Sequence, residues 1–284
     1  MLLEHSTSGV IFTMQGKLGV KIHAYLYPLF ARSAWIFGKK YVSNEKNLAM
    51  TVNEILTQLR EFGDENTKNT LIKHGAKEPF FGVKVVDLKK ILKKTKKNHE
   101  LSLALYQTGN SDAMYLAGLM ADEKQITKEQ LEDWADKAYW YYLSEYTVPW
   151  VAAETAYGFE IGQKWIQSGE ERIAAAGWAT LAYFAGVNED EDLDIDAYRK
   201  LLNTVESEIH NAQNRVRYVM NGFVIAVGAY ITALTEKSIE IATKIGKVNV
   251  DLGGTACKVP LAKDYIQKII DKGRVGKKRK TARC

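Results

Sequence analysis

The sequence has too few of the residues on which several fold classes depend. Its two cysteines, Cys257 and Cys284, cannot by themselves form a disulfide framework or a four-ligand zinc site. Only four prolines occur, beside many residues that favour helices, which argues against a loop-rich or all-β chain. No apolar run reaches the roughly 18 residues that a transmembrane helix needs. We therefore expect a soluble, cytoplasmic protein with reduced thiols and no membrane partner.

The usual spacings of metal and nucleophile sites are also missing. His74, His99 and His210 are scattered, and no His-x-x-x-His or Cys-x-x-Cys pair occurs. There is no nucleophile elbow and no dinucleotide-binding fingerprint. Gly253-Gly254-Thr255 could form an anion-binding nest before a helix, but it lacks a full phosphate-loop spacing. We predict no metal and no cofactor.

Acidic residues are scarce in the first 49 positions, where only Glu4 and Glu45 occur. No helical or strand period holds for long in this segment. The order of a secretory signal, with charge before an apolar run and a cleavage site after it, is absent. We interpret residues 1–49 as a poorly ordered or non-native N-terminal extension. The alternative is an acid-poor targeting peptide.

From Met50 onward the pattern is helical. Val52, Ile55 and Leu59 lie on one face of a first helix, and Thr127 with Gln130 has the spacing of a capping box. Further helices are expected over residues 142–158, 171–185, 195–210, 214–233 and 236–245. Short polar loops between helices of this length are typical of an α-solenoid. We predict an all-α fold, an α–α superhelix of HEAT-like repeats over 50–246. Residues 247–284 would add a loop, a last helix from Pro260 and a basic tail.

Charge is segregated along the chain, although the net charge is only +5. Seven lysines lie between Lys84 and Lys97, and seven lysines or arginines lie between Lys272 and Arg283. An acidic loop occupies residues 189–196. Clustered cations bind polyanions because the neutralised phosphates release condensed counterions. Two basic clusters favour a polyanionic partner, whereas a solvated helix face and a disordered tail are the alternative.

Aromatic residues gather in one short segment, where residues 139–142 read Tyr-Trp-Tyr-Tyr. Most buried aromatics belong to the core, but four consecutive ones cannot all face one way on a helix. Some of them must reach solvent or a cleft. Glu145 follows Tyr141 by four residues, so the two share a helix face if the helix is unbroken. Pro149 indicates a helix start or a kink just beyond.

Two arginines, Arg215 and Arg217, stand at the start of an expected helix. The helix dipole does not favour a cation there, so these side chains could point at an anion. A surface salt bridge with Glu206 or Glu208 is the alternative.

In several segments the chain resembles the DNA alkylation repair family of HEAT-like-repeat DNA glycosylases. The matching segments keep the family's order and together cover roughly residues 78 to 284. They are Phe81–Lys89, Leu103–Tyr106 with Ala113–Ala117, Tyr139–Pro149 and Lys247–Cys284. Each is short, so the specificity of the resemblance comes from their order.

The resemblance implies roles for individual residues. Glu145 falls where the family has a catalytic Asp. Tyr141, Trp140 and Phe223 would line a lesion cleft, with Tyr141 and Phe223 standing where the family has tryptophans. The phosphate contacts that we assign are Lys90, Lys93, Lys94, Arg215 and Arg217. Where the family has an arginine in its cleft, residues 173–176 of this chain read Ile-Ala-Ala-Ala, so that arginine is not retained. Arg172 lies close by but would point in another direction on the helix.

The expected function is therefore DNA repair. The protein would bind alkylated double-stranded DNA as a monomer and, as a glycosylase, hydrolyse the N-glycosidic bond of N3- or N7-alkylpurines. Aromatic faces would hold the cationic base, and Glu145 would stabilise the oxocarbenium-like sugar and orient water. The alternatives are a non-catalytic DNA-binding member of the family and a helical-repeat protein–protein scaffold.

Overall fold

The structure is a computed structural model that describes the strands His5–Ser6, Gly9–Gln15 and Lys21–Leu26, and residues 50–284. The chain divides into two compact units, Met1–Ala49 and Met50–Cys284.

In the first unit, the three strands pair into an antiparallel sheet of order β1-β2-β3 (β1 His5–Ser6, β2 Gly9–Gln15, β3 Lys21–Leu26). The β2–β3 register runs from Val10 opposite Leu26 to Gln15 opposite Lys21. Much of the predicted extension over 1–49 lies outside the described residues. Within them the chain pairs as strands, which the sequence pattern did not indicate. The β2 sequence, Gly-Val-Ile-Phe-Thr-Met-Gln, contains the β-branched and aromatic residues that favour such pairing.

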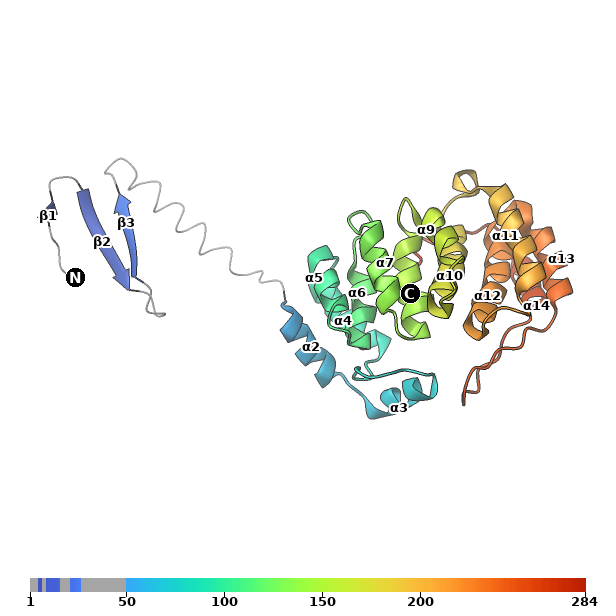
Figure 1. The fold of residues 1–284 in the computed structure, drawn as a ribbon, viewed down its shortest axis with the longest axis horizontal. Helices are drawn as coiled ribbons and strands as arrows, with labels where there is room; N and C mark the ends of the chain where they lie inside the picture. Colours follow the sequence, from blue (N-terminus) through green and yellow to red (C-terminus); the bar gives the residue numbers. More distant parts are fainter. Residues whose placement is uncertain (1–4, 7–8, 16–20, 27–49) are drawn as a thin grey trace. The chain divides into compact units, whose positions relative to one another are not determined.

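The second unit is helical and forms the predicted α-solenoid (Figure 1). Its helices are α2 Val52–Glu61, α3 Glu65–Lys73, α4 Val85–Thr95, α5 His99–Tyr106, α6 Ser111–Met120, α7 Lys128–Lys137, the π-helix η3 Leu143–Thr147, α8 Val148–Ala153, α9 Gly158–Trp165, α10 Glu171–Val187, the 3₁₀ turn η4 Asp190–Asp192, α11 Ile195–Glu208, α12 Asn214–Tyr230, the 3₁₀ turn η5 Thr232–Leu234, α13 Thr235–Ile245 and α14 Ala262–Asp271.

Helix starts follow the local sequence signals closely. The predicted capping box at Thr127 and Gln130 is present at α7, and Thr51 with Glu54 forms another at α2. The helix expected over 142–158 instead ends at Ala153, and a separate α9 begins at Gly158. A Cβ atom at Gly158 would collide with the carbonyl oxygen of Ala152, so only glycine allows the chain to turn back so tightly there. Periodicity alone could not locate this turn.

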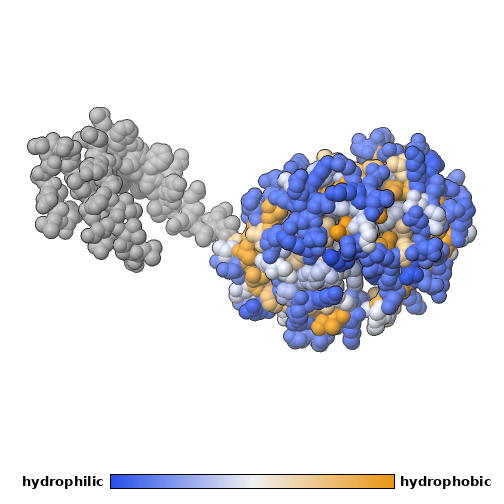
Figure 2. All heavy atoms as spheres, viewed as in Figure 1, coloured by the Kyte–Doolittle hydropathy of each residue, from blue (hydrophilic) through white to orange (hydrophobic). Residues whose placement is uncertain are grey.

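The core runs along a row of inner helices. Every residue of α6 is buried, and α10 packs against both its neighbours in the row, α8 and α12. The close approach of α9 to α10 depends on glycine, because a Cβ at Gly177 would lie 2.5 Å from the backbone nitrogen of Ile166. Among the described residues, no single helix is long and apolar enough to cross a membrane; α12 with Thr232–Ile245 passes that test only as a pair bent by 119°. Figure 2 shows a mainly hydrophilic face on this unit, with small separate apolar areas.

The C-terminal tail is not the disordered segment that its composition allows. Instead, residues 276–284 run back across the C-terminal ends of the inner helices, and we call this segment the strap. The backbone N–H of Gly276 donates to the Ala229 carbonyl of α12, and that of Arg279 donates to the Gly186 carbonyl of α10. In Figure 1 the C-terminus accordingly lies in the middle of the helical array and not beyond α14.

Two buried cations fasten the strap. Lys278, whose side chain is 7% exposed, donates to the Ala185 carbonyl at 3.0 Å and pairs with Asp190 at 2.8 Å. These contacts place a positive charge at the C-terminal end of α10, where the helix dipole favours cations.

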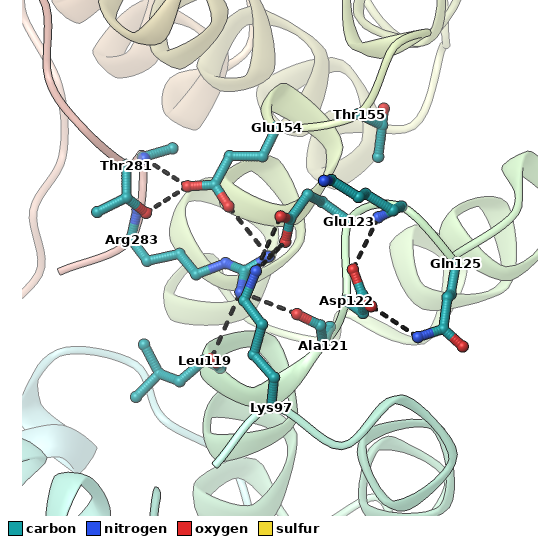
Figure 3. Close-up of polar contacts among 12 residues, drawn as sticks. Lys97, Leu119, Ala121, Asp122, Glu123, Gln125, Glu154, Thr155, Thr281 and Arg283 are labelled. Carbon is teal, nitrogen blue, oxygen red and sulfur yellow. Dashed lines mark hydrogen bonds and ion pairs between the residues drawn. The ribbon is translucent and has the colours of Figure 1, made fainter. Parts of the chain in front are cut away.

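Arg283 is the second anchor and inserts between two carboxylates (Figure 3). Its guanidinium lies 3.1 Å from Glu123 and 3.1 Å from Glu154, and it donates to the Ala121 carbonyl at 2.9 Å. The side chain is 8% exposed, so the charge is almost fully removed from water and depends on these partners. The strap therefore joins the last segment of the chain to α6 and α8 near the middle of the solenoid.

Replacing Arg283 with alanine should destabilise the fold. The substitution removes the cation that pairs with the partly buried Glu154, whereas Glu123 keeps Lys97 at 2.6 Å. Removing one partner of a buried ion pair costs about 3 kcal/mol. Urea unfolding followed by circular dichroism would measure the loss. Arg274→Ala, which removes an exposed arginine just before the strap, is the matched control. Equal stability of the two variants would show that Arg283 does not hold the strap in place.

Candidate functional site

A break in helical regularity shapes the aromatic segment. Residues 143–147 form one turn of π-helix that leads directly into α8, and the N–H of Val148 donates to the Leu143 carbonyl five residues back. Pro149 explains the local geometry because it has no N–H to donate to the carbonyl of Glu145, four residues earlier. Single π turns of this kind occur often at functional sites. Here the turn carries Glu145 toward the neighbouring inner helices.

Glu145 is buried in an ion pair with Arg215. Arg215 Nε donates to Oε1 at 2.6 Å and Nη2 donates to Oε2 at 2.5 Å, so the guanidinium engages both carboxylate oxygens. The side chain of Glu145 is 2% exposed and that of Arg215 is 19% exposed. The pair connects residues 70 positions apart and joins η3 to the first turn of α12. The salt bridge with Glu206 or Glu208 that was the alternative for Arg215 does not form, because its partner is the Glu145 carboxylate.

Two tyrosine rings enclose the Arg215 guanidinium. Its central carbon lies 4.3 Å from the centre of the Tyr141 ring and 4.5 Å from the centre of the Tyr218 ring. Glu171, at the start of α10, accepts a hydrogen bond from the Arg215 backbone N–H at 2.7 Å. The arginine is thus held by ion pairing, by cation–π contact and through its own backbone. Since the dipole disfavours a cation at this helix start, these contacts account for its position.

The electrostatics of the pair reflect its burial. Burial raises the pKa of Glu145 to about 7, and the two hydrogen bonds from Arg215 act in the opposite direction. Burial also raises the pKa of Tyr141 to about 12. The tyrosine hydroxyl therefore remains protonated at neutral pH, whereas Glu145 titrates close to neutrality.

The other predicted cleft aromatics lie elsewhere. Trp140 is 4% exposed, and its indole N–H donates to the Ser111 hydroxyl at 2.8 Å in the core. Phe223 is fully buried between Trp178 and Tyr198, with ring centres 5.0 Å and 5.9 Å away. Both side chains fill the interior, and neither is among the residues that line the cleft beside Glu145. Of the three predicted aromatics, the structure brings only Tyr141 to the pair.

The predicted phosphate contacts also separate into groups. Lys90, Lys93 and Lys94 lie on the exposed side of α4, where Lys90 pairs with Asp87 at 2.7 Å. Arg215 belongs to the buried pair instead. The Nε atom of Arg217 is buried without a hydrogen-bond partner in the described part of the chain. The five residues do not form one surface around Glu145.

Some members of the site had little signal in the sequence. Tyr218 lies three residues after Arg215 on α12, a spacing that places both on one helix face. Glu171 had no such local signal. Arg172 does point away from the site, as expected, because it donates to the carbonyls of Asp136 and Ala138 at the end of α7.

A cleft of about 310 Å³ opens beside Glu145. It lies between α10, α12 and α14, and Arg279 of the strap borders it. Its lining is mostly small apolar side chains and tyrosines: Glu145, Tyr146, Ala179, Ala182, Tyr183, Tyr218, Val219, Gly222, Ile225, Ala226, Ala229, Tyr230, Tyr265, Ile269 and Arg279. Across the described residues, no group of three or more His, Cys, Asp or Glu side chains is arranged to hold a metal ion.

The Glu145 titration should make stability depend on pH. A carboxyl whose pKa rises from 4.5 to about 7 on folding stabilises the protein below pH 4.5 and loses that contribution as pH rises through 7. Between these limits, the wild type should lose stability relative to Glu145→Gln by up to about 1.4 kcal/mol per pH unit. Urea unfolding of both proteins at pH 5, 6 and 8 measures the difference. A constant difference across this range would contradict the raised pKa.

The comparisons with known proteins agree on one family for this chain. The model of the family described as DNA alkylation repair enzyme matches residues 55–244. Two uncharacterised Listeria proteins, Lin0241 of Listeria innocua and Lmo0209 of Listeria monocytogenes, are each 34% identical over 225 residues, covering 77% of this chain and 97% of theirs.

A solved structure is also similar, with a TM-score of 0.77 and 37% identity over 83% of this chain and all of that chain. It is described as representing a new family of proteins related to the HEAT-like repeat DNA glycosylases, with affinity for branched DNA structures. The predicted HEAT-like superhelix is therefore confirmed. The chain belongs to the DNA alkylation repair enzyme family.

Proposed function

We propose that this protein binds branched or alkylated DNA without excising a base, as a non-catalytic member of its family. One observation carries the proposal: both oxygens of Glu145 accept hydrogen bonds from Arg215, and the carboxylate is 2% exposed. The similar solved protein, with its affinity for branched DNA, supports the choice of partner.

The chemistry of base excision explains why this pairing matters. Cleavage of a glycosidic bond develops positive charge on the sugar, which a nearby carboxylate stabilises while it positions water. In this chain Arg215 already neutralises Glu145 and occupies both of its oxygens. Releasing the carboxylate would leave a partly buried guanidinium unpaired, which is energetically costly. The resting site is therefore poorly suited to excision.

One observation favours the glycosylase as a second candidate. Glu145 borders the cleft between α10, α12 and α14, so it lies close to space that a ligand could enter. A DNA phosphate that drew Arg215 away would expose the carboxylate to that cleft. The two candidates therefore differ in whether DNA binding opens the ion pair.

Base release distinguishes the two candidates. We expect no release of 3-methyladenine or 7-methylguanine from methylated DNA above the protein-free rate, because Glu145 remains paired. High-performance liquid chromatography of the released bases measures this. Release by the wild type, abolished in Glu145→Gln, would establish the glycosylase and overturn the proposal. A family glycosylase of known activity serves as the positive control.

DNA binding itself is tested by salt dependence. We expect the wild type to bind a three-way junction more tightly than a linear duplex of equal length, measured by fluorescence anisotropy. The logarithm of the affinity should fall by about 0.9 per phosphate contact per unit of log salt concentration. Weak, salt-independent binding to both would instead favour a protein–protein scaffold.

A further inference from the structure

The floor of the cleft beside Glu145 consists of small residues from two helices, α10 and α12. We call these residues the floor. Gly222, Ala226 and Ala229 follow one another on the cleft-facing side of α12, and Ala179 and Ala182 face them from α10. These spacings place small side chains along one face of each helix. A Cβ atom at Gly222 would meet nothing within 4 Å, so the space above the floor is open. Small residues here leave room that larger side chains would fill.

Tyrosines form the walls of this cleft. Tyr183 and Tyr230 lie at the C-terminal ends of α10 and α12, and Tyr265 faces them from α14. Tyr265 is 50% exposed. Burial raises the pKa of Tyr183 well above its ordinary value, so its hydroxyl remains a neutral hydrogen-bond donor. Aromatic faces beside a small apolar floor suit a flat ring such as a nucleobase.

The strap supplies the charge. Arg279 borders the cleft at the end opposite the Glu145–Arg215 pair, and its positive charge acts on the Tyr183 hydroxyl. Its backbone is fixed by the 2.7 Å hydrogen bond to the Gly186 carbonyl, and Lys278 anchors the strap just before it. The Arg279 side chain is exposed and forms no ion pair within the described part of the chain. Arg279 is thus a cation whose backbone is fixed and whose guanidinium N–H groups can donate to a ligand.

These features define one kind of ligand. We propose that the cleft takes a single unpaired nucleotide of a DNA strand, with the base between the tyrosines and its phosphate on Arg279. A volume of about 310 Å³ is at the small end of ligand pockets, which suits one nucleotide and not a paired step. Unpaired nucleotides occur where duplex arms meet, so the cleft gives the proposed branched-DNA binding a structural basis. This inference rests on that proposed function.

Two matched pairs of variants test the cleft. Arg279→Gln and Lys280→Gln remove the same charge from adjacent positions of the strap, but only Arg279 borders the cleft. Gly222→Phe fills the cleft without changing charge, and Gly222→Ala is its small-residue control. Circular dichroism melting of all four variants, compared with the wild type, verifies that each one folds.

The binding substrates are two three-way junctions that differ only in two unpaired thymidines at the branch point, with a linear duplex as reference. We expect the wild type to prefer the unpaired junction roughly tenfold, the size of a base-stacking contribution. Arg279→Gln and Gly222→Phe should lose this preference, whereas Lys280→Gln and Gly222→Ala should keep it. Fluorescence of 2-aminopurine placed at the unpaired position reports directly whether the base enters the aromatic cleft.

The outcomes separate this inference from the proposed function. Equal losses for Arg279→Gln and Lys280→Gln, or wild-type preference in Gly222→Phe, would overturn the cleft as a nucleotide site. Equal binding of both junctions by the wild type would also overturn the cleft as a nucleotide site, but it would leave the proposed DNA binding intact. A wild type that binds none of the three DNAs would overturn both.

Discussion

The buried pair of Glu145 and Arg215 organises the centre of this molecule. It joins a π turn to the start of α12 across 70 positions of sequence, and Glu171 of α10 holds the arginine backbone. The π turn, α10 and α12 therefore meet at one ion pair, where two tyrosine rings enclose the guanidinium. Because removing either ion would leave the other poorly solvated, the residues around it are constrained as a group.

The same ion pair determines what Glu145 can do at the candidate site. The resemblance drew attention to Glu145, and the structure places this carboxylate in an ion pair whose partner no local pattern reveals. A cation in the first turn of α12 signals an unusual contact, but not which of many acidic residues it meets. The cleft beside the pair depends on glycine and alanine spacing, which in a sequence is indistinguishable from ordinary close helix packing.

The fold was more predictable than the site. Amphipathic spacing and capping residues such as Thr127 identified most helices, because these signals act within a few residues. The break at Gly158 and the burial of Phe223 depend on contacts between helices, so spacing along the chain could not reveal them. The basic tail was the least predictable segment. Its composition is that of a disordered chain, and its order comes from carboxylates and helix carbonyls that lie far back in the sequence.

The position of that tail alters how a repeat protein of this kind should lose its structure. Solenoids are quasi-one-dimensional: each repeat contacts its neighbours, and the terminal repeats fray independently of the middle. Here Arg283 contacts Glu123, 160 residues earlier, so the last segment cannot leave without disturbing the central repeats. The strap closes a long loop in the native contacts and couples the C-terminal half to the middle. We expect such a chain to unfold as a single cooperative domain and not repeat by repeat.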